Sequence, residues 1–193
     1  MNNVSIGIET VGDGLRPFTA SQIIANITLC QYLLDKYPSI NPKMIIGHNI
    51  WAHDRKVDPM NFSWQIFARA SSFSLSSYNI GVYPSKYSLQ LKNNAKILIS
   101  NKSKNKVKSI KKVQKLLQEY GYLIKDEPGV LGNDTIFAIS SYNLHFKFEE
   151  FWAKHTETIK ILAIVGANKD LAKEILYFDE NDEIILKDVL SKF

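Results

Sequence analysis

The chain has 193 residues, of which 45% are hydrophobic, so it is long enough to bury a core and to form one or two small domains. Its single cysteine, Cys30, excludes an intramolecular disulfide and a cysteine-based zinc cluster, so a metal site would have to use histidine and carboxylate ligands. The N-terminal sequence MNNVSIGIETVG lacks the features of an export signal, and no apolar stretch approaches the length of a membrane span. We therefore expect a soluble chain with no membrane span and no export signal.

The net charge of +5 is distributed unevenly along the chain. Nine lysines and no acidic residue lie between Lys92 and Lys115, whereas the C-terminal end is acidic and apolar. A basic run of this kind attracts nucleic acid or another anionic polymer in some proteins. Because no aromatic side chains alternate with the lysines to stack on bases, we favour a solvated linker leading into a helix, and we expect no nucleic-acid partner.

The first elements in chain order predict a strand, a helix and a second strand. Apolar and other residues alternate over 4–9, which indicates a strand that ends at Glu9. Thr19 and Gln22 have the spacing of a capping box, and apolar residues at helical intervals continue to about Tyr37. Residues 44–47 are short and apolar, as in a buried strand. Such a unit places the two strands parallel in one sheet, so an α/β fold is expected.

A dense polar loop, GHNIWAHDRKVDP, follows at residues 47–59. If the two strands are neighbours, their carboxyl ends bring Glu9 and His48 to one edge of the sheet, where α/β proteins commonly bind ligands. His48 and Asp58 can fold back on one another, and imidazole with carboxylate is an acceptable pair of ligands for Zn²⁺. Glu9 could then activate the bound water, and Lys56 could stabilise an oxyanion. The alternatives are a structural histidine and a surface ion pair between Lys56 and Asp58.

The combination of IGIE at residues 6–9 with GHNIWAHDRKVDP at residues 47–59 resembles the type 2 family of zinc-dependent N-acetylmuramoyl-L-alanine amidases. These enzymes share a fold with the peptidoglycan recognition proteins, and the resemblance covers about residues 3–67. It implies that His48 and Asp58 bind zinc and that Glu9 and Lys56 assist catalysis. The reaction implied is hydrolysis of the amide bond between N-acetylmuramic acid and L-alanine of the stem peptide.

The family's pattern includes one further histidine ligand, on a strand upstream of the one that ends at Glu9. Only Met1 to Ser5 precede IGIE here, so we expect residues 1–70 to be the C-terminal part of an amidase domain, with an incomplete mixed sheet and flanking helices. His53, His145 and His155 are not expected to replace the missing ligand. A partner chain could supply the missing half, as in a split amidase, or the chain could be a remnant of a longer enzyme.

A second resemblance covers residues 109–146, which look like the small helical peptidoglycan-binding domain that is often appended to such amidases. The pattern consists of an amphipathic helix, a loop containing glycines, and a second helix that begins near Asn133 or Asp134. A plain helical hairpin is the alternative. We therefore expect a linker at 71–105, a small all-α domain at 106–150 and a helical tail at 151–193. The tail is expected to pack against this domain and to contain an acidic break at 179–183.

The sequence thus favours a peptidoglycan amidase that requires Zn²⁺ and acts on peptidoglycan or muropeptides. A non-catalytic peptidoglycan-binding protein is the alternative from a different functional class. Nucleic-acid binding through the lysine run is the weakest hypothesis. The resemblance implies the cell envelope or periplasm, whereas the absence of a signal peptide favours the cytoplasm, and the sequence leaves both open.

Overall fold

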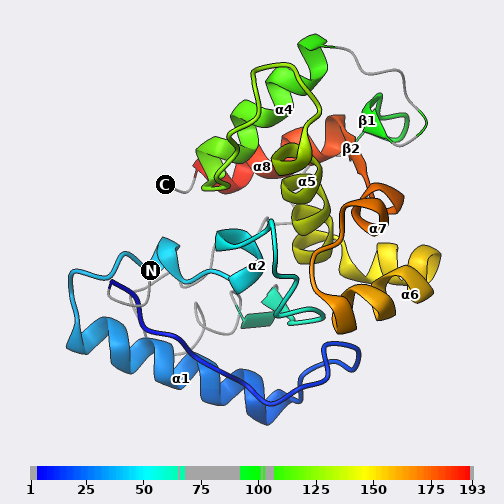
Figure 1. Cartoon of the computed structure of the whole chain (residues 1–193). Coiled ribbons are helices and arrows are strands. Elements are labelled where there is room, and N and C mark those ends of the chain that lie inside the picture. Colours follow the sequence, from blue (N-terminus) through cyan, green and yellow to red (C-terminus); the bar gives the residue numbers. More distant parts are fainter. Residues whose placement is uncertain (1–3, 65, 68–91, 101, 103–106, 192–193) are drawn as a thin grey trace.

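The computed structural model describes residues 4–64, 66–67, 92–100, 102 and 107–191, and this part of the chain is mostly helical with one two-stranded sheet (Figure 1). This composition is compatible with the expected α/β class only in a coarse sense. None of the described helices is long and apolar enough to cross a membrane. The elements are α1 (Ala20–Lys36), η1 (Pro42–Met44), α2 (His48–Trp51), β1 (Ile97–Ser100), α4 (Val107–Tyr120), α5 (Asn133–Phe146), α6 (Phe148–Val165), α7 (Lys169–Glu174), β2 (Tyr177–Asp179) and α8 (Glu180–Ser191).

The first predicted helix is confirmed as α1, including its capping box. The Thr19 hydroxyl accepts a hydrogen bond from the Gln22 backbone N–H at 3.3 Å, and the Gln22 side chain accepts one from the Thr19 N–H at 2.9 Å. The C-cap is Tyr37, immediately before a proline. One face of α1 packs against aromatic residues further along the chain, and its buried residues are Ile23, Ile27, Cys30 and Leu34.

The two strands expected on either side of α1 are absent from the described residues, so that prediction is wrong. Residues 5–13 have no regular structure, and the apolar side chains expected to face a core are exposed, at 85% for Val4 and 50% for Ile6. Residues 42–44 form the short helix η1, and 45–47 continue without strand pairing. Alternation determines which face of a strand is apolar, but a strand forms only where another strand accepts its hydrogen bonds.

The one sheet in the described residues pairs two segments that are far apart in sequence. β1 and β2 run antiparallel, with Ile99 opposite Phe178 and Ser100 opposite Tyr177. β1 lies within residues 71–105, which we expected to form a linker, and β2 lies in the expected helical tail. The division of the chain into domains at the boundaries given above remains a prediction.

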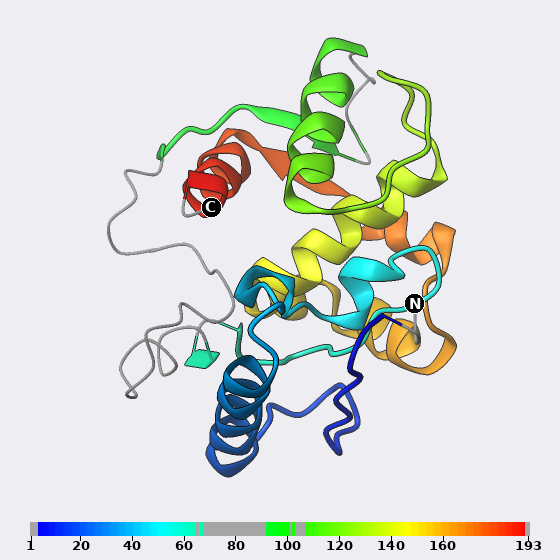
Figure 2. The same cartoon turned by 90° about the vertical axis from the view of Figure 1, so that its left-hand side faces the viewer.

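The C-terminal half folds around α5. α5 lies between α4 on one side and α6 and α7 on the other, while α1 lies at the opposite end of the molecule from α4 (Figures 1 and 2). The predicted start of the second helix at Asn133 is confirmed, although Gly132 rather than Asn133 or Asp134 is the N-cap residue. The expectation that the tail packs on this module is also confirmed, because one cluster of buried apolar residues includes members of α4, α5, α7, β2 and α8.

The expected acidic break at 179–183 is instead the N-terminus of α8. The Asp179 carboxylate accepts hydrogen bonds from the backbone N–H groups of Asn181 and Asp182, and Asp182 accepts one in return from the Asp179 N–H at 2.9 Å. This reciprocal arrangement is a capping box built from two aspartates. Acidic side chains at this end of a helix also interact favourably with the helix dipole, so the acidic cluster starts a helix and does not interrupt one.

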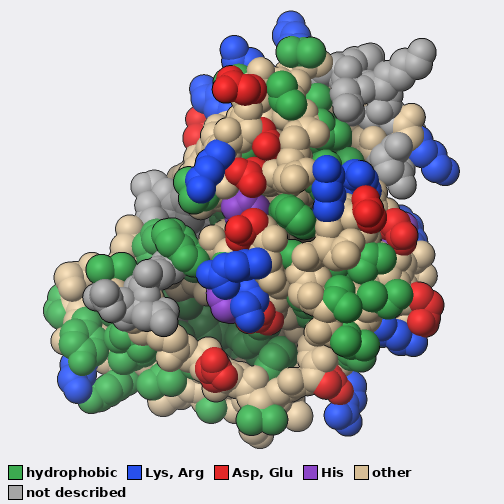
Figure 3. All heavy atoms as spheres, in the orientation of Figure 1, with side chains coloured by type: hydrophobic (Ala, Val, Ile, Leu, Met, Phe, Trp, Pro, Cys, Tyr) green, Lys and Arg blue, Asp and Glu red, His purple; other side chains and the backbone are tan. Residues whose placement is uncertain are grey.

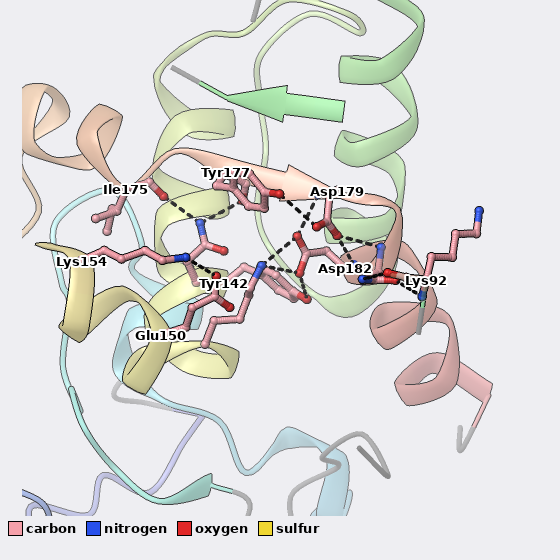
Figure 4. Close-up of polar contacts among 11 residues, drawn as sticks. Lys92, Tyr142, Glu150, Lys154, Ile175, Tyr177, Asp179 and Asp182 are labelled. Atoms are coloured by element: carbon pink, nitrogen blue, oxygen red, sulfur yellow. Dashed lines mark hydrogen bonds and ion pairs between the residues drawn. The ribbon is translucent and has the colours of Figure 1, made fainter. Parts of the chain in front are cut away.

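Polar side chains of α5, together with Lys147 between α5 and α6, contact the strand β2 and the start of α8 (Figure 4). The buried amide of Asn143 donates hydrogen bonds to the carbonyl groups of Ile175, at 2.7 Å, and Tyr177, at 3.0 Å. The Tyr142 hydroxyl donates to the Asp182 carboxylate at 3.1 Å. Burial raises the pKa of Asp182, and the Lys147 ammonium group 3.0 Å away opposes this effect.

Part of the lysine run pairs with the acidic first turns of α8. Lys92 Nζ lies 2.7 Å from Glu180 Oε2, and Lys112 Nζ lies 2.5 Å from Glu183 Oε2. The segments before and within α4 are therefore electrostatically complementary to the C-terminal helix. Two other lysines of the run, 104 and 106, lie outside the described residues.

Candidate functional site

The polar loop folds back on itself immediately after a buried glycine. Gly47 is the N-cap residue of the short helix α2, which begins with His48. The Asn49 N–H then donates a hydrogen bond to the Asp58 carbonyl oxygen at 2.7 Å, which joins the two ends of the loop. A Cβ atom on Gly47 would overlap the Asn49 side-chain oxygen and would lie 3.0 Å from Pro59 Cδ, so the loop requires glycine at this position.

The side chains of His48 and Asp58 meet at the mouth of this loop, as their spacing predicts. His48 Nδ1 lies 3.0 Å from Asp58 Oδ2, and the two side chains remain 43% and 57% exposed. Two ligands of a tetrahedral zinc ion, one nitrogen and one oxygen, are separated by about 3.4 Å given ordinary zinc–ligand distances. The pair therefore fits zinc after an opening of a few tenths of an ångström. Among the residues the structure describes, no group of three histidine, cysteine or acidic side chains is arranged to hold a metal ion.

The two residues expected to assist catalysis do not contact this pair. Glu9 is exposed on the irregular segment before α1, and Lys56 is half-buried at the edge of a small internal cavity. Within the described ranges, neither side chain forms a hydrogen bond or ion pair with His48 or Asp58, so the alternative ion pair between Lys56 and Asp58 is also absent. The roles of Glu9 and Lys56, like those of His48 and Asp58 as ligands, remain predictions.

Two other histidines are buried within the molecule, away from solvent. His53 is 4% exposed, lines the same small cavity as Lys56 and contacts the Tyr122 ring edge to face at 5.7 Å. His145 is 7% exposed and packs against the Trp64 ring at a centroid distance of 4.7 Å. Burial lowers the pKa of both imidazoles, to about 3 for His145. Neither side chain is available as a third ligand beside His48 in this structure.

The loop that carries the pair lies against α5. The Ser141 hydroxyl donates a hydrogen bond to the Asn49 carbonyl oxygen at 2.7 Å, and both residues are buried. The roles of Asn49 and Ser141 could not be predicted from the sequence, because a contact between residues 92 positions apart leaves no local pattern. On the face seen in Figure 1, a hollow lined by hydrophobic side chains opens below a group of Lys, Arg and His side chains (Figure 3).

A family model described as N-acetylmuramoyl-L-alanine amidase matches residues 1–61, which include α1 and the whole loop with His48 and Asp58. The N-terminal third of the chain is therefore similar to this amidase family. We refer to residues 1–61 as the amidase segment. This match agrees with the resemblance found in the sequence and covers both His48 and Asp58.

Two curated amidases match the same region of the chain. The 1,6-anhydro-N-acetylmuramyl-L-alanine amidase AmpD of Haemophilus influenzae is 35% identical over 65 residues, which is 33% of this chain and 35% of that protein. The protein of the same name from Enterobacter cloacae is 39% identical over 67 residues, which is 34% of this chain and 35% of that protein. The match thus spans about a third of the length of either relative. No solved structure matches this chain.

Proposed function

We propose that this chain takes part in zinc-dependent hydrolysis of the amide bond between N-acetylmuramic acid and L-alanine in peptidoglycan or its fragments. The observation that carries the proposal is the short distance between His48 Nδ1 and Asp58 Oδ2, 3.0 Å, within a segment that matches an amidase family model. Both side chains are partly exposed, so a metal ion and a substrate can reach them. The two AmpD amidases act, by their names, on the same class of amide bond.

In the proposed reaction, His48 and Asp58 hold the metal ion, which when bound polarises a water molecule and the carbonyl group under attack. Glu9 accepts the proton of the water as its oxygen adds to the lactyl carbonyl carbon. Lys56 stabilises the negative charge that develops on the carbonyl oxygen. The carbon–nitrogen bond then breaks, and Glu9 returns the proton to the leaving amino group of L-alanine. Both Glu9 and Lys56 must move towards the pair for this reaction.

A catalytic zinc ion takes three protein ligands and one water, so the pair requires a third ligand. Among the side chains that the structure describes, no third histidine, cysteine or acidic group is arranged to complete a metal site. We therefore propose that the third ligand is supplied from outside residues 1–193, as a partner chain would supply it. The proposed activity belongs to the assembled site, and this chain contributes two of its ligands.

Exogenous imidazole provides a direct test because it can take the place of an absent histidine ligand. The purified chain would be incubated with Zn²⁺ and a muramyl peptide, with and without imidazole, and release of the peptide with a free L-alanine amino group would be measured by mass spectrometry. The proposal predicts that imidazole raises both zinc retention and hydrolysis. Neither effect should appear in His48→Ala or Asp58→Ala, whereas His155→Ala should behave like the wild type.

Two outcomes would contradict the proposal. Equal zinc retention by the wild type and both variants, with imidazole present, would show that His48 and Asp58 do not bind the metal ion. Hydrolysis that persists in both variants would place the activity elsewhere in the chain.

A further inference from the structure

A continuous path of hydrogen bonds links Asp58 to α5 through one residue of the loop. The backbone N–H of Asn49 donates to the Asp58 carbonyl oxygen at 2.7 Å, and the carbonyl oxygen of Asn49 accepts from the Ser141 hydroxyl at 2.7 Å. Asn49 is adjacent to His48 in sequence. Both polar groups of its backbone are therefore used to fix the positions of the two candidate ligands relative to each other and to α5.

Two residues of this path, Asn49 and Ser141, are buried, whereas Asp58 is exposed. Asn49 is 1% exposed and Ser141 is 3% exposed. An unpaired buried carbonyl group costs free energy, so the Ser141 hydroxyl stabilises the position of the Asn49 peptide group. A hydroxyl group is needed at position 141 because an alanine would leave the Asn49 carbonyl oxygen without this donor.

Apolar packing also fixes the chain after Asn49 to the same helix, at Ile50 and at Met60. Ile50, 2% exposed, belongs to the core cluster that includes Ile139 and Tyr142 of α5. Met60, also 2% exposed, packs in a separate cluster with Leu144 of α5. The amidase segment and the C-terminal helices therefore share two buried clusters in addition to the hydrogen bond.

We propose that Ser141 is a positioning residue for the His48–Asp58 pair and that it acts through the backbone of Asn49. α5 then has a role in the amidase site, beyond any role in binding the cell wall. The expected effect of Ser141 on zinc binding rests on the proposed function. Its expected effect on the position of the loop does not depend on whether zinc binds.

The experiment compares Ser141→Ala with Ser140→Ala in the full chain. Ser140 is the adjacent residue on α5 and is also buried, but its hydroxyl bonds to the Phe137 carbonyl oxygen of its own helix at 3.0 Å. Hydrogen exchange of the Asn49 amide, measured by nuclear magnetic resonance, reports on the loop without any metal. Zinc affinity, measured by competition with a chromophoric chelator in the presence of imidazole, reports on the pair.

Ser141→Ala is expected to speed exchange of the Asn49 amide roughly three- to tenfold and to weaken zinc binding by a similar factor. A change of this size corresponds to the net free energy that one hydrogen bond contributes. Ser140→Ala is expected to change neither quantity. If Ser141→Ala does not fold, Ser141→Cys, which keeps a weaker donor of similar size, should show a smaller change in the same direction.

The two proposals fail in distinguishable ways. Unchanged exchange of the Asn49 amide in a folded Ser141 variant would overturn the positioning role, even if the wild type binds zinc. Faster exchange in Ser141→Ala, with no zinc binding by any form of the protein, would support the positioning role and count against the proposed function.

Discussion

Lys147 Nζ lies 3.0 Å from Asp182 Oδ1, and the two side chains are only 11% and 1% exposed. This buried ion pair joins the start of α6 to the start of α8. Removing the cation leaves a buried carboxylate without its charged partner, which is among the most costly single changes in a folded protein. Lys147→Met is therefore expected to lower the free energy of unfolding by about 3–5 kcal/mol, as measured by urea denaturation.

The matched control is Lys154→Met on α6, the helix that follows Lys147. Lys154 Nζ lies 3.0 Å from Glu150 Oε1, but both side chains are largely exposed, and a surface ion pair of this kind contributes less than about 1 kcal/mol (Figure 4). Equal losses of stability in the two variants would show that the pair of Lys147 and Asp182 has no special role.

His145 is expected to make the protein sensitive to acid. Its pKa is about 3 in the folded state because the imidazole is buried, against an ordinary value of 6.5. The unfolded chain therefore binds more protons below pH 6.5, and stability falls as the pH decreases from 6.5 towards 3. At pH 5 this contribution amounts to about 2 kcal/mol. His145→Phe should remove this loss of stability in acid. The unfolding free energy of the variant, relative to that of the wild type, should therefore increase as the pH decreases from 6.5. A difference that stays constant with pH would contradict this prediction.

Cys30 is expected to be unreactive in the folded protein. The side chain is 4% exposed on the inner face of α1, and burial raises the pKa of the thiol to about 11. Because this is the chain's single cysteine, a thiol reagent such as dithionitrobenzoate gives an unambiguous signal. We expect no labelling at pH 8 under native conditions and one equivalent after denaturation, whereas rapid native labelling would show that α1 does not pack as described.

Gly47→Ala is expected to disrupt the loop that carries His48 and Asp58. The new methyl group would overlap the Asn49 side-chain oxygen and would lie 3.2 Å from Trp64 Cζ2, which predicts a loss of stability of about 1–3 kcal/mol. Gly7→Ala is the control, because an added Cβ there has no neighbour within 4 Å. Thermal unfolding of both variants measures the effect, and similar melting temperatures for the two would contradict the close packing at Gly47.

The elements that could be predicted from the sequence are those specified by local signals. The capping box at Thr19 and the helical spacing of apolar residues were sufficient for α1 and for the helix pair α4 and α5, whereas the start of α8 was missed. The expected strands at 4–9 and 44–47 failed because strand formation depends on a partner that periodicity does not identify. The pairing of β1 with β2 was missed for the same reason, since Ile99 and Phe178 are distant in sequence.

The candidate site was predictable only in part. His48 and Asp58 lie within one loop, so their approach followed from a short turn between them. The support from Ser141 depends on the packing of α5 against the amidase segment, and nothing in the spacing of the loop predicts it. Likewise, the expected approach of Glu9 to His48 relied on two parallel strands that are absent from the described residues.

Zinc binding by the pair is the most direct test of the account. Zn²⁺ would be titrated into the ¹⁵N-labelled chain in the presence of imidazole, with side-chain signals of histidine observed by nuclear magnetic resonance. We expect saturable binding of one zinc ion that selectively perturbs the signals of His48, with an affinity reduced at least tenfold in both His48→Ala and Asp58→Ala. Absence of saturable binding, or binding unaffected by either substitution, would contradict the assignment of His48 and Asp58 as zinc ligands.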